Sequence, residues 1–188
     1  MRRTLLLLAT MMFALVVAGG VALAATVTCS GDPECVGTDE NDRIKGSNND
    51  EHIFGFGGSD IIDGNGGFDH VVGDRSALGE PTTTPDGDDK LDGGPDADRI
   101  YGFGGSDTLI GSQGGDYIDA VSGESSTSGA SNTIRAGIGD DEISANNGVS
   151  DRIDCGSGSD SAQVDLNDLD NVAKNCESVD PLPVPTSG

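Results

Sequence analysis

A branched aliphatic residue recurs at nine-residue steps through most of the chain, and glycines and polar residues fill the positions between. In the stretch GFGGSDIID, Gly55–Asp63, glycines hold three of the first four positions, an aspartate holds the sixth and an isoleucine the eighth. This frame places twelve nonapeptides between residues 37 and 163, with insertions at Gly73–Thr83 and Ala120–Ser126 and one extra residue, Ala145. Eleven of the twelve eighth positions are isoleucine, leucine or valine, so the period belongs to the whole segment.

One inward-pointing aliphatic residue per nonapeptide predicts a turn of about six residues followed by a strand of about three. A single such side chain cannot bury a core, whereas stacked coils bury a continuous aliphatic column. Two nonapeptides complete one coil of 18 residues, so successive turns alternate between two edges of the stack. The pattern therefore predicts an all-β solenoid with two short strands in each coil.

The sixth position of the repeat carries an acidic residue almost without exception. Ten of the twelve are aspartate, and Glu51 and Asn132 hold the other two places. A loop without chemistry does not need such repetition. The turn glycines supply positive φ and let backbone carbonyls crowd inward.

The first 25 residues predict a secretory signal peptide. Arg2 and Arg3 precede an apolar run from Leu5 to Val17, and small residues end the segment at Ala22–Ala25. The alternative, a membrane anchor, requires about 20 uninterrupted apolar residues, and this glycine-interrupted run is shorter. The sequence thus predicts export, with no membrane insertion elsewhere in the chain.

The rest of the chain is strongly acidic and poor in aromatic residues. Removal of Arg2 and Arg3 takes the net charge from −23 to −25, and aromatic residues make up 4% of the sequence, with no tryptophan. Such a surface repels nucleic acid and anionic lipid but attracts cations. High charge with low hydrophobicity is typical of disorder, so a folded chain needs a further source of stability.

Four cysteines are left after export, in two local pairs, Cys29 with Cys35 and Cys155 with Cys176. An even number in an oxidising compartment favours disulfides, and the local pairing is favoured among the three that four cysteines allow. Zinc binding would need Cys-x-x-Cys or histidine spacing, which the sequence lacks. The two short loops that these disulfides would close are expected to stabilise the two ends of an elongated fold.

The repeats match the pattern Gly-Gly-x-Gly-x-Asp-x-aliphatic-x over about residues 37–163, and the chain therefore resembles the RTX, or haemolysin-type, calcium-binding repeat family. The resemblance implies a parallel β-roll in which several calcium ions lie between turns on the same edge, one coil apart, bound by aspartate carboxylates and turn carbonyls. It places Asn132 as a weak member of one line of aspartates and Glu51 at the head of the other. The calcium ligands that it implies are Asp42, Asp60, Asp69, Asp89, Asp98, Asp107, Asp116, Asp141, Asp151 and Asp160, with turn carbonyls around Gly55, Gly57, Gly64, Gly66, Gly102, Gly104 and Gly111.

Departures from the repeat pattern distinguish the more regular of these sites from the less regular ones. The first two repeats have few glycines, the first insertion breaks the turn before Asp89, and Asn132 removes a charge at the ninth repeat. A stacked roll with solvated aspartates and no metal is the alternative, but at a net charge of −25 it would carry large uncompensated repulsion. The most regular sites are expected at Asp60, Asp69, Asp98, Asp107 and Asp116, followed by Asp141 and Asp160.

The ends resemble the caps of exported members of this family. Residues 26–36 are expected to form an N-terminal cap, and residues 164–180 a C-terminal cap tied back by Cys155 and Cys176. Caps of this kind protect the open edges of a solenoid. The roll itself would span residues 37–163, and residues 181–188 would form a flexible tail.

The sequence offers little for catalysis. His52 and His70, the two histidines, both take the outward seventh position of a strand, and no zinc-protease or nucleophile-elbow motif is present. The alternative, an effector enzyme that uses the roll as a scaffold, would draw on Asp74, Arg75 and Glu80 in the first insertion. We therefore expect a secreted, non-catalytic calcium-binding protein that folds on calcium and has a structural, adhesive or calcium-sequestering role. A cell-surface or polysaccharide partner is left open.

Outward aromatic residues recur in two neighbouring groups, Phe54 with Phe56 and Tyr101 with Phe103. They allow two interpretations, a ligand or adhesion stripe and simple packing over neighbouring coils. Packing is favoured, because isolated exposed apolar residues are common in folded proteins.

Overall fold

The computed structural model describes residues 24–31, 33–74, 86–121, 130–165, 171–173 and 175–182. Within these ranges the chain forms two parallel sheets of eight strands each, and none of the described residues is helical. The described part accordingly contains no helix with the length and apolar character needed to span a membrane. The predicted signal peptide up to residue 23, most of both insertions and the tail from residue 183 lie outside the described residues.

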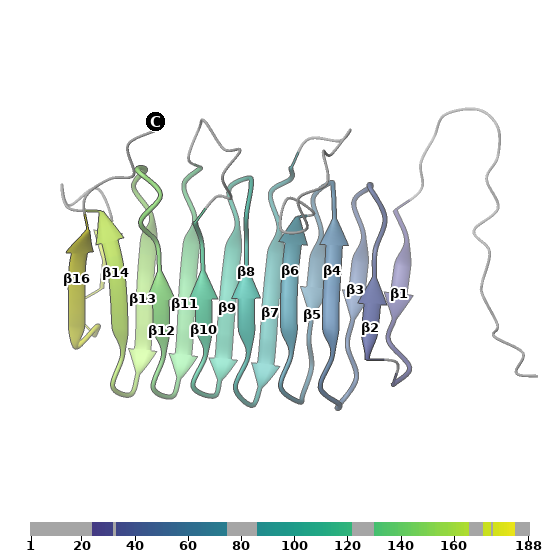
Figure 1. Cartoon of the computed structure of the whole chain (residues 1–188), viewed down its shortest axis with the longest axis horizontal. Coiled ribbons are helices and arrows are strands. Elements are labelled where there is room, and N and C mark those ends of the chain that lie inside the picture. Colours follow the sequence, from purple (N-terminus) through teal and green to yellow (C-terminus); the bar gives the residue numbers. More distant parts are fainter. Residues whose placement is uncertain are drawn as a thin grey trace, which may run out of the picture.

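The odd-numbered strands form one sheet and the even-numbered strands the other, as expected for a roll in which each coil contributes one strand to each sheet (Figure 1). Neighbouring strands within each sheet are parallel, and the two sheets run in opposite directions. Sheet A contains β1 (Thr26–Thr28), β3 (Arg43–Lys45), β5 (Ile61–Asp63), β7 (Lys90–Pro95), β9 (Thr108–Gln113), β11 (Thr133–Ile138), β13 (Arg152–Ser157) and β15 (Asn171–Val172). Sheet B contains β2 (Glu34–Val36), β4 (His52–Phe56), β6 (His70–Asp74), β8 (Arg99–Tyr101), β10 (Tyr117–Asp119), β12 (Glu142–Ser144), β14 (Ser161–Asp165) and β16 (Ser178–Leu182).

The strand register follows the eighth position of the repeat through every interruption. Ile44 pairs with Ile62 across 18 residues, whereas Ile62 pairs with Leu91 across 29. The extra residues between Ile62 and Leu91 therefore do not shift the strand pairing. A one-residue slip would turn each inward aliphatic side chain to the outer face, so burial of these side chains fixes the register.

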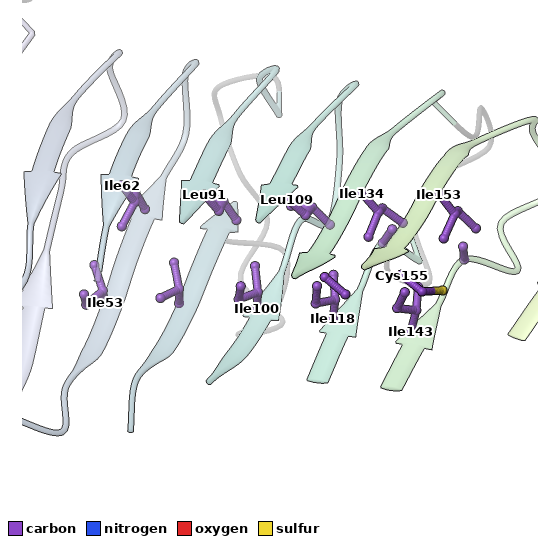
Figure 2. Packing of buried hydrophobic residues seen from close by; sticks show 14 of the residues in the cluster. Ile53, Ile62, Leu91, Ile100, Leu109, Ile118, Ile134, Ile143, Ile153 and Cys155 are labelled. Carbon is purple, nitrogen blue, oxygen red and sulfur yellow. The ribbon is translucent and has the colours of Figure 1, made fainter. Parts of the chain in front are cut away.

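The core is two facing columns of aliphatic side chains, one from each sheet (Figure 2). Most of these side chains are at most 1% exposed, as the periodicity predicts. Each one is flanked along its strand by side chains that point outward. The column of sheet A contains Val27, Ile44, Ile62, Leu91, Leu109, Ile134, Ile153 and Val172, and the buried column of sheet B contains Cys35, Ile53, Val71, Ile100, Ile118, Ile143 and Ala162.

Both predicted disulfides are present, Cys29–Cys35 and Cys155–Cys176. Cys29, Cys35 and Cys155 are buried in the core cluster, so the disulfides continue the apolar column at the two ends. The segments expected as caps also contribute strands: β1 and β2 extend the sheets at one end, and β15 and β16 extend them at the other.

The predicted positions of the interruptions were wrong. Gly73 and Asp74 belong to β6, where Asp74 pairs with Phe56, and the same turn resumes at Asp86, which bridges to Gly58. The inserted stretch therefore lies between Asp74 and Asp86. The first residues of each turn follow directly after the preceding strand, so the extra residues come later in the turn. The repeat alignment used only the sixth and eighth positions and could not show where within the turn the extra residues lie.

The same correction applies to the other two interruptions. The first residue of a regular turn donates its N–H to the last strand residue of the next coil, as Gly102 does to Asp119. Ala120 donates in the same way to Ser144, and Ala145 to Gln163, both at 2.9 Å. Both alanines are completely buried first positions of the repeat, and the extra residues follow them within the turns.

Candidate metal sites along the two turn edges

The sixth-position side chains form two buried columns, one along each edge of the roll. All twelve are at most 3% exposed, although eleven of them are acidic. Within each column, one side-chain oxygen accepts the backbone N–H of the equivalent residue one coil earlier, at 2.6 to 3.0 Å. The structure thus produces the two lines that the resemblance implied. One contains Asp42, Asp60, Asp89, Asp107, Asn132 and Asp151, and the other Glu51, Asp69, Asp98, Asp116, Asp141 and Asp160.

Both columns begin or end on groups that were not identified from the sequence. Ala25 N donates to Asp42 Oδ1 at 2.7 Å, and Asp160 N donates to Glu177 Oε2 at 2.9 Å. Glu177 therefore continues the second column into the C-terminal segment. The available signal was its place two residues before Val179, which pairs with the core residue Ala162 of the last repeat.

Eight aspartates of the two columns each keep one buried carboxylate oxygen, Oδ2, without a hydrogen-bond partner among the described residues. Buried polar oxygens are almost always hydrogen-bonded, because the loss of water costs about 1–3 kcal/mol or more for a charged group. A row of such oxygens is the feature that a bound cation would explain. The eight are Asp60, Asp69, Asp89, Asp98, Asp107, Asp116, Asp141 and Asp160.

The other sixth-position residues receive hydrogen bonds from nearby protein groups. Thr38 donates to Asp42 Oδ2 from its N–H at 2.5 Å and from its hydroxyl at 2.9 Å, and Ser47 donates to both carboxylate oxygens of Glu51. Asn147 donates to Asp151 at 3.1 Å, and the amide of Asn132 itself donates to Ala120 O at 3.2 Å. These four positions are satisfied without a cation.

The second residue of the turn separates the two groups. Thr38 and Ser47 donate to the carboxylate below them, whereas seven of the eight other aspartates follow a second position with positive φ. Two of these seven second positions are phenylalanines, although residues other than glycine rarely adopt a positive φ. Phe56 stacks on Phe54 at 6.2 Å between ring centroids, and Phe103 on Tyr101 at 6.1 Å, so ring contacts offset this cost. The seven second positions are Phe56, Asn65, Gly94, Phe103, Ser112, Gly137 and Gly156.

In six of the eight turns the orphaned oxygen lies where the Cβ of a first-position side chain would be placed, because that position is glycine; the other two turns have Ala136 and Cys155 there. A Cβ on Gly55 would collide with Asp60 Oδ2 and lie 2.6 Å from the carbonyl oxygen of Gly73 in the next coil. At Gly102 the corresponding Cβ would lie 2.5 Å from Asp107 Oδ2. A carboxylate oxygen and a carbonyl oxygen therefore converge beside the first-position glycine. All seven glycines named from the sequence for their carbonyls are buried in these turns.

Oxygen-only surroundings suit calcium, which takes six to eight hard oxygen ligands. No three acidic, histidine or cysteine side chains converge anywhere in the described ranges. A cation held here must therefore take many of its ligands from backbone carbonyls and from carboxylates of successive coils. The residues present fit that ligand set.

Burial raises the pKa of these carboxyl groups far above the ordinary value of 3.8. The pKa values of Asp60, Asp69, Asp98 and Asp107 rise to about 7, and that of Asp89 to about 9. Desolvation is the largest cause in each case, and the N–H donated from the neighbouring coil opposes it. Without a cation, the folded roll therefore disfavours ionised aspartates at neutral pH.

Asp74 is a further buried carboxyl group that was not assigned to the metal sites from the sequence. It is fully buried at the second position of the Asp89 turn, and desolvation, followed by repulsion from Asp86, raises its pKa to about 8. Its repulsion also contributes to the raised pKa of Asp89. Asp74 was considered only for a catalytic cluster with Arg75 and Glu80, both of which lie outside the described residues.

The family comparison agrees with this geometry. The model of a family described as RTX calcium-binding nonapeptide repeat (4 copies) matches residues 36–71, 86–118 and 126–162. These segments cover more than half of the chain. Neither the curated proteins nor the solved structures contain a significant match.

Proposed function

Because the chain belongs to the RTX calcium-binding nonapeptide-repeat family, we propose that it is an exported, non-catalytic calcium-binding roll that folds when calcium fills its turn edges. The observation that carries the proposal is the set of eight buried carboxylate oxygens without a hydrogen-bond partner in the described part of the chain. Each belongs to a column in which aspartates repeat once per coil. The roll would serve as a structural or adhesive module, or as a calcium store, outside the cell.

The proposed calcium ligands are the eight orphaned aspartates and the turn carbonyls beside them. On one edge Asp60, Asp89 and Asp107 follow one another in consecutive coils, linked by hydrogen bonds of 2.8 and 2.9 Å. On the other edge the five members are consecutive as well. They are Asp69, Asp98, Asp116, Asp141 and Asp160. Calcium would supply positive charge and link adjacent coils.

Asp42 and Asp151 were also predicted as ligands, and the proposal now leaves them out. Thr38 supplies two hydrogen bonds to Asp42, and Asn147 supplies one to Asp151. A protein donor at a carboxylate oxygen competes with a cation for that oxygen. The proposed ligands therefore begin at Asp60 on one edge and at Asp69 on the other, in turns whose second position has positive φ.

Coupling between calcium binding and folding follows from the charge of the chain. The net charge is −23 for the full sequence, and the aspartate columns bring carboxylates together one coil apart. A ligand that binds only the folded state stabilises it by mass action. Metal binding at sites that exist only in the folded chain therefore contributes directly to the free energy of folding.

The test is circular dichroism of residues 26–188 at pH 8 during titration with calcium and, separately, with magnesium. We expect an expanded chain in chelator and a β-sheet signal that forms cooperatively as calcium rises toward millimolar concentrations, the range of extracellular calcium modules. Magnesium should be much weaker, because it demands octahedral geometry and releases its water reluctantly. A β-sheet signal that is complete in chelator and unchanged by calcium would contradict the proposal.

Export is supported by the signal-like residues 1–25 and by two disulfides, which persist in oxidising compartments. The test is expression of the full chain in its host, followed by N-terminal sequencing of protein from the medium or cell surface. Cleavage after Ala25 with both disulfides formed is the expected result. Reduced, uncleaved protein inside the cell would refute export.

A further inference from the structure

The outer faces of the two sheets carry different chemistry. Five of the six cationic side chains in the described ranges lie on the outer face of sheet A, together with acidic, polar and aliphatic residues. They are Arg43, Lys45, Lys90, Arg135 and Arg152. The outer face of sheet B instead gathers rings on four adjacent strands, β4, β6, β8 and β10. Those rings are His52, Phe54, His70, Tyr101 and Tyr117.

These rings contact one another in a continuous row along the roll. His52 and His70 are register partners on adjacent strands, with ring centroids 5.2 Å apart, and His70 meets the ring of Tyr101 at 4.9 Å. Tyr101 in turn lies 5.9 Å from Tyr117. The side chains are only partly buried, or exposed in the case of His52, so part of each ring stays accessible from outside.

A hollow of about 540 Å³ opens beside this row. It is lined by His52, His70, Arg99 and Tyr101 on the sheet and by Pro33, Asp50 and Phe68 at the rim. The rim is itself ordered by contacts: Phe68 N donates to Asp50 Oδ1 at 2.9 Å, and the Arg99 guanidinium lies 5.0 Å above the Phe68 ring. The volume is in the range of small-molecule sites in proteins, about 300–1,000 Å³.

The lining selects the chemistry of the ligand. Aromatic faces pack against flat apolar surfaces, while the carboxylate, guanidinium, imidazoles and phenol offer both donors and acceptors of hydrogen bonds. Asp50 and Arg99 balance in formal charge, and the net charge of −23 disfavours a polyanion. Because no three metal-binding side chains converge in the described ranges, a metal ion does not account for the histidine pair.

We propose that this hollow on sheet B binds a neutral sugar unit of a polysaccharide, with the row of rings as the track for adjoining units. A pyranose ring presents apolar C–H faces and a rim of hydroxyl groups, which match the aromatic faces and the polar side chains. The proposal goes beyond calcium binding and lies on the outer face, away from the turn edges. Its failure is distinguishable from failure of calcium-dependent folding, because the folded state is checked separately by circular dichroism.

The chain carries its own reporter for this face. It has no tryptophan and two tyrosines, Tyr101 and Tyr117, both on sheet B within the ring row. Tyrosine emission from the calcium-loaded protein therefore reports on this surface without a label. A Tyr117→Phe variant leaves Tyr101, which lines the hollow, as the single tyrosine.

The experiment titrates calcium-loaded protein with cellohexaose, chitohexaose and, as a polyanion, an oligogalacturonate, following tyrosine emission and heat of binding. We expect saturable binding of at least one neutral hexasaccharide, and a loss of affinity of about tenfold or more in Tyr101→Ala and in His70→Ala. Ile61→Ala is the matched control, since Ile61 is an exposed apolar residue on the outer face of sheet A. It should bind like the parent, with the same circular dichroism spectrum.

Three outcomes would overturn the proposal. The first is a folded parent protein that binds neither neutral hexasaccharide. The second is binding that survives both Tyr101→Ala and His70→Ala, which would place the ligand elsewhere. The third is tighter binding of oligogalacturonate than of the neutral sugars. If Tyr101→Ala loses its calcium-dependent spectrum, Tyr101→Val replaces it, because valine suits a strand but has no aromatic face and should still lose affinity.

Discussion

Metal-free protein should fold better in mild acid than at pH 8, which is the reverse of ordinary acid denaturation. In the unfolded chain the aspartates titrate near their ordinary pKa of 3.8, while burial raises the pKa of Asp60 and Asp107 to about 7 in the roll. A folded-state pKa above the unfolded value means that the roll takes up protons on folding. That stability is fully present below about pH 4 and is lost as the pH rises through about 7, or about 9 for Asp89.

The magnitude is large because the effect repeats along both edges. One pKa unit corresponds to about 1.4 kcal/mol. Burial raises the pKa of seven of the eight orphaned aspartates. Even a single unit at each of the six whose pKa rises to about 6 or higher amounts to about 8 kcal/mol, which is comparable to the free energy of unfolding of a typical domain. Ionisation of the columns is therefore sufficient to unfold the metal-free roll.

The assay is urea unfolding of metal-depleted residues 26–188 at pH 5, 6, 7 and 8 and constant ionic strength, followed by circular dichroism. We expect a folded protein at pH 5 and little or none at pH 8, with calcium restoring the fold at pH 8. A variant with Asp60→Asn and Asp107→Asn is the control, since its amides copy Asn132 and remain neutral at every pH. It should lose part of the pH dependence. Metal-free stability that is equal at pH 5 and pH 8, or that rises with pH, would refute the reasoning.

Three further predictions concern single features of the roll. Replacing Asp60 and Asp107 together by alanine should raise the calcium midpoint in a circular dichroism titration several-fold more than Asn132→Ala does, and equal shifts would contradict the assignment of sites. Gly55→Ala should destabilise the calcium-loaded roll by about 2 kcal/mol in urea unfolding, because the added Cβ collides with Asp60 Oδ2. Gly66→Ala is the control and should be tolerated, because the nearest atom to its Cβ is 3.5 Å away. Replacing Cys155 and Cys176 by alanine should lower the free energy of unfolding in urea by about 3 kcal/mol. This is about 1 kcal/mol more than for Cys29 and Cys35, because the longer loop restricts the unfolded chain more. The opposite order would exclude loop entropy as the main cause.

Much of the architecture could be predicted because the repeat encodes it locally. The spacing of Ile44, Ile62 and Leu91 sets which side chains face inward, and burial then fixes the strand register. The two lines of aspartates follow from the same count, since a residue two places before each inward aliphatic side chain lies directly before a strand. The local disulfides follow from short separations along the chain.

Positions that depend on contacts between coils could not be read from the repeat. Ala120 and Ala145 act as first positions because of backbone hydrogen bonds to the next coil, and alanine there gave no glycine signal. Glu177 joins a column although it lies outside any recognisable nonapeptide. Asp74 appeared to belong to an insertion, because the frame resumes only after it.

The second position of the turn is where sequence departures acquire a physical meaning. Thr38 and Ser47 donate hydrogen bonds from their N–H and hydroxyl groups to the first carboxylate of each edge, so the carboxylates of the first complete coil need no cation. Further along, positive φ at this position, held even by Phe56 and Phe103, accompanies carboxylates that lack such donors. The same turn thus has two chemical states, one closed by hydrogen bonds and one open to a cation. Because the turns closed by Thr38 and Ser47 lie at the N-terminal end of the roll, we expect that end to provide a metal-independent edge on which calcium-dependent coils can stack. The stacked rings of Phe54 with Phe56 and of Tyr101 with Phe103 support the positive-φ backbone of two later turns.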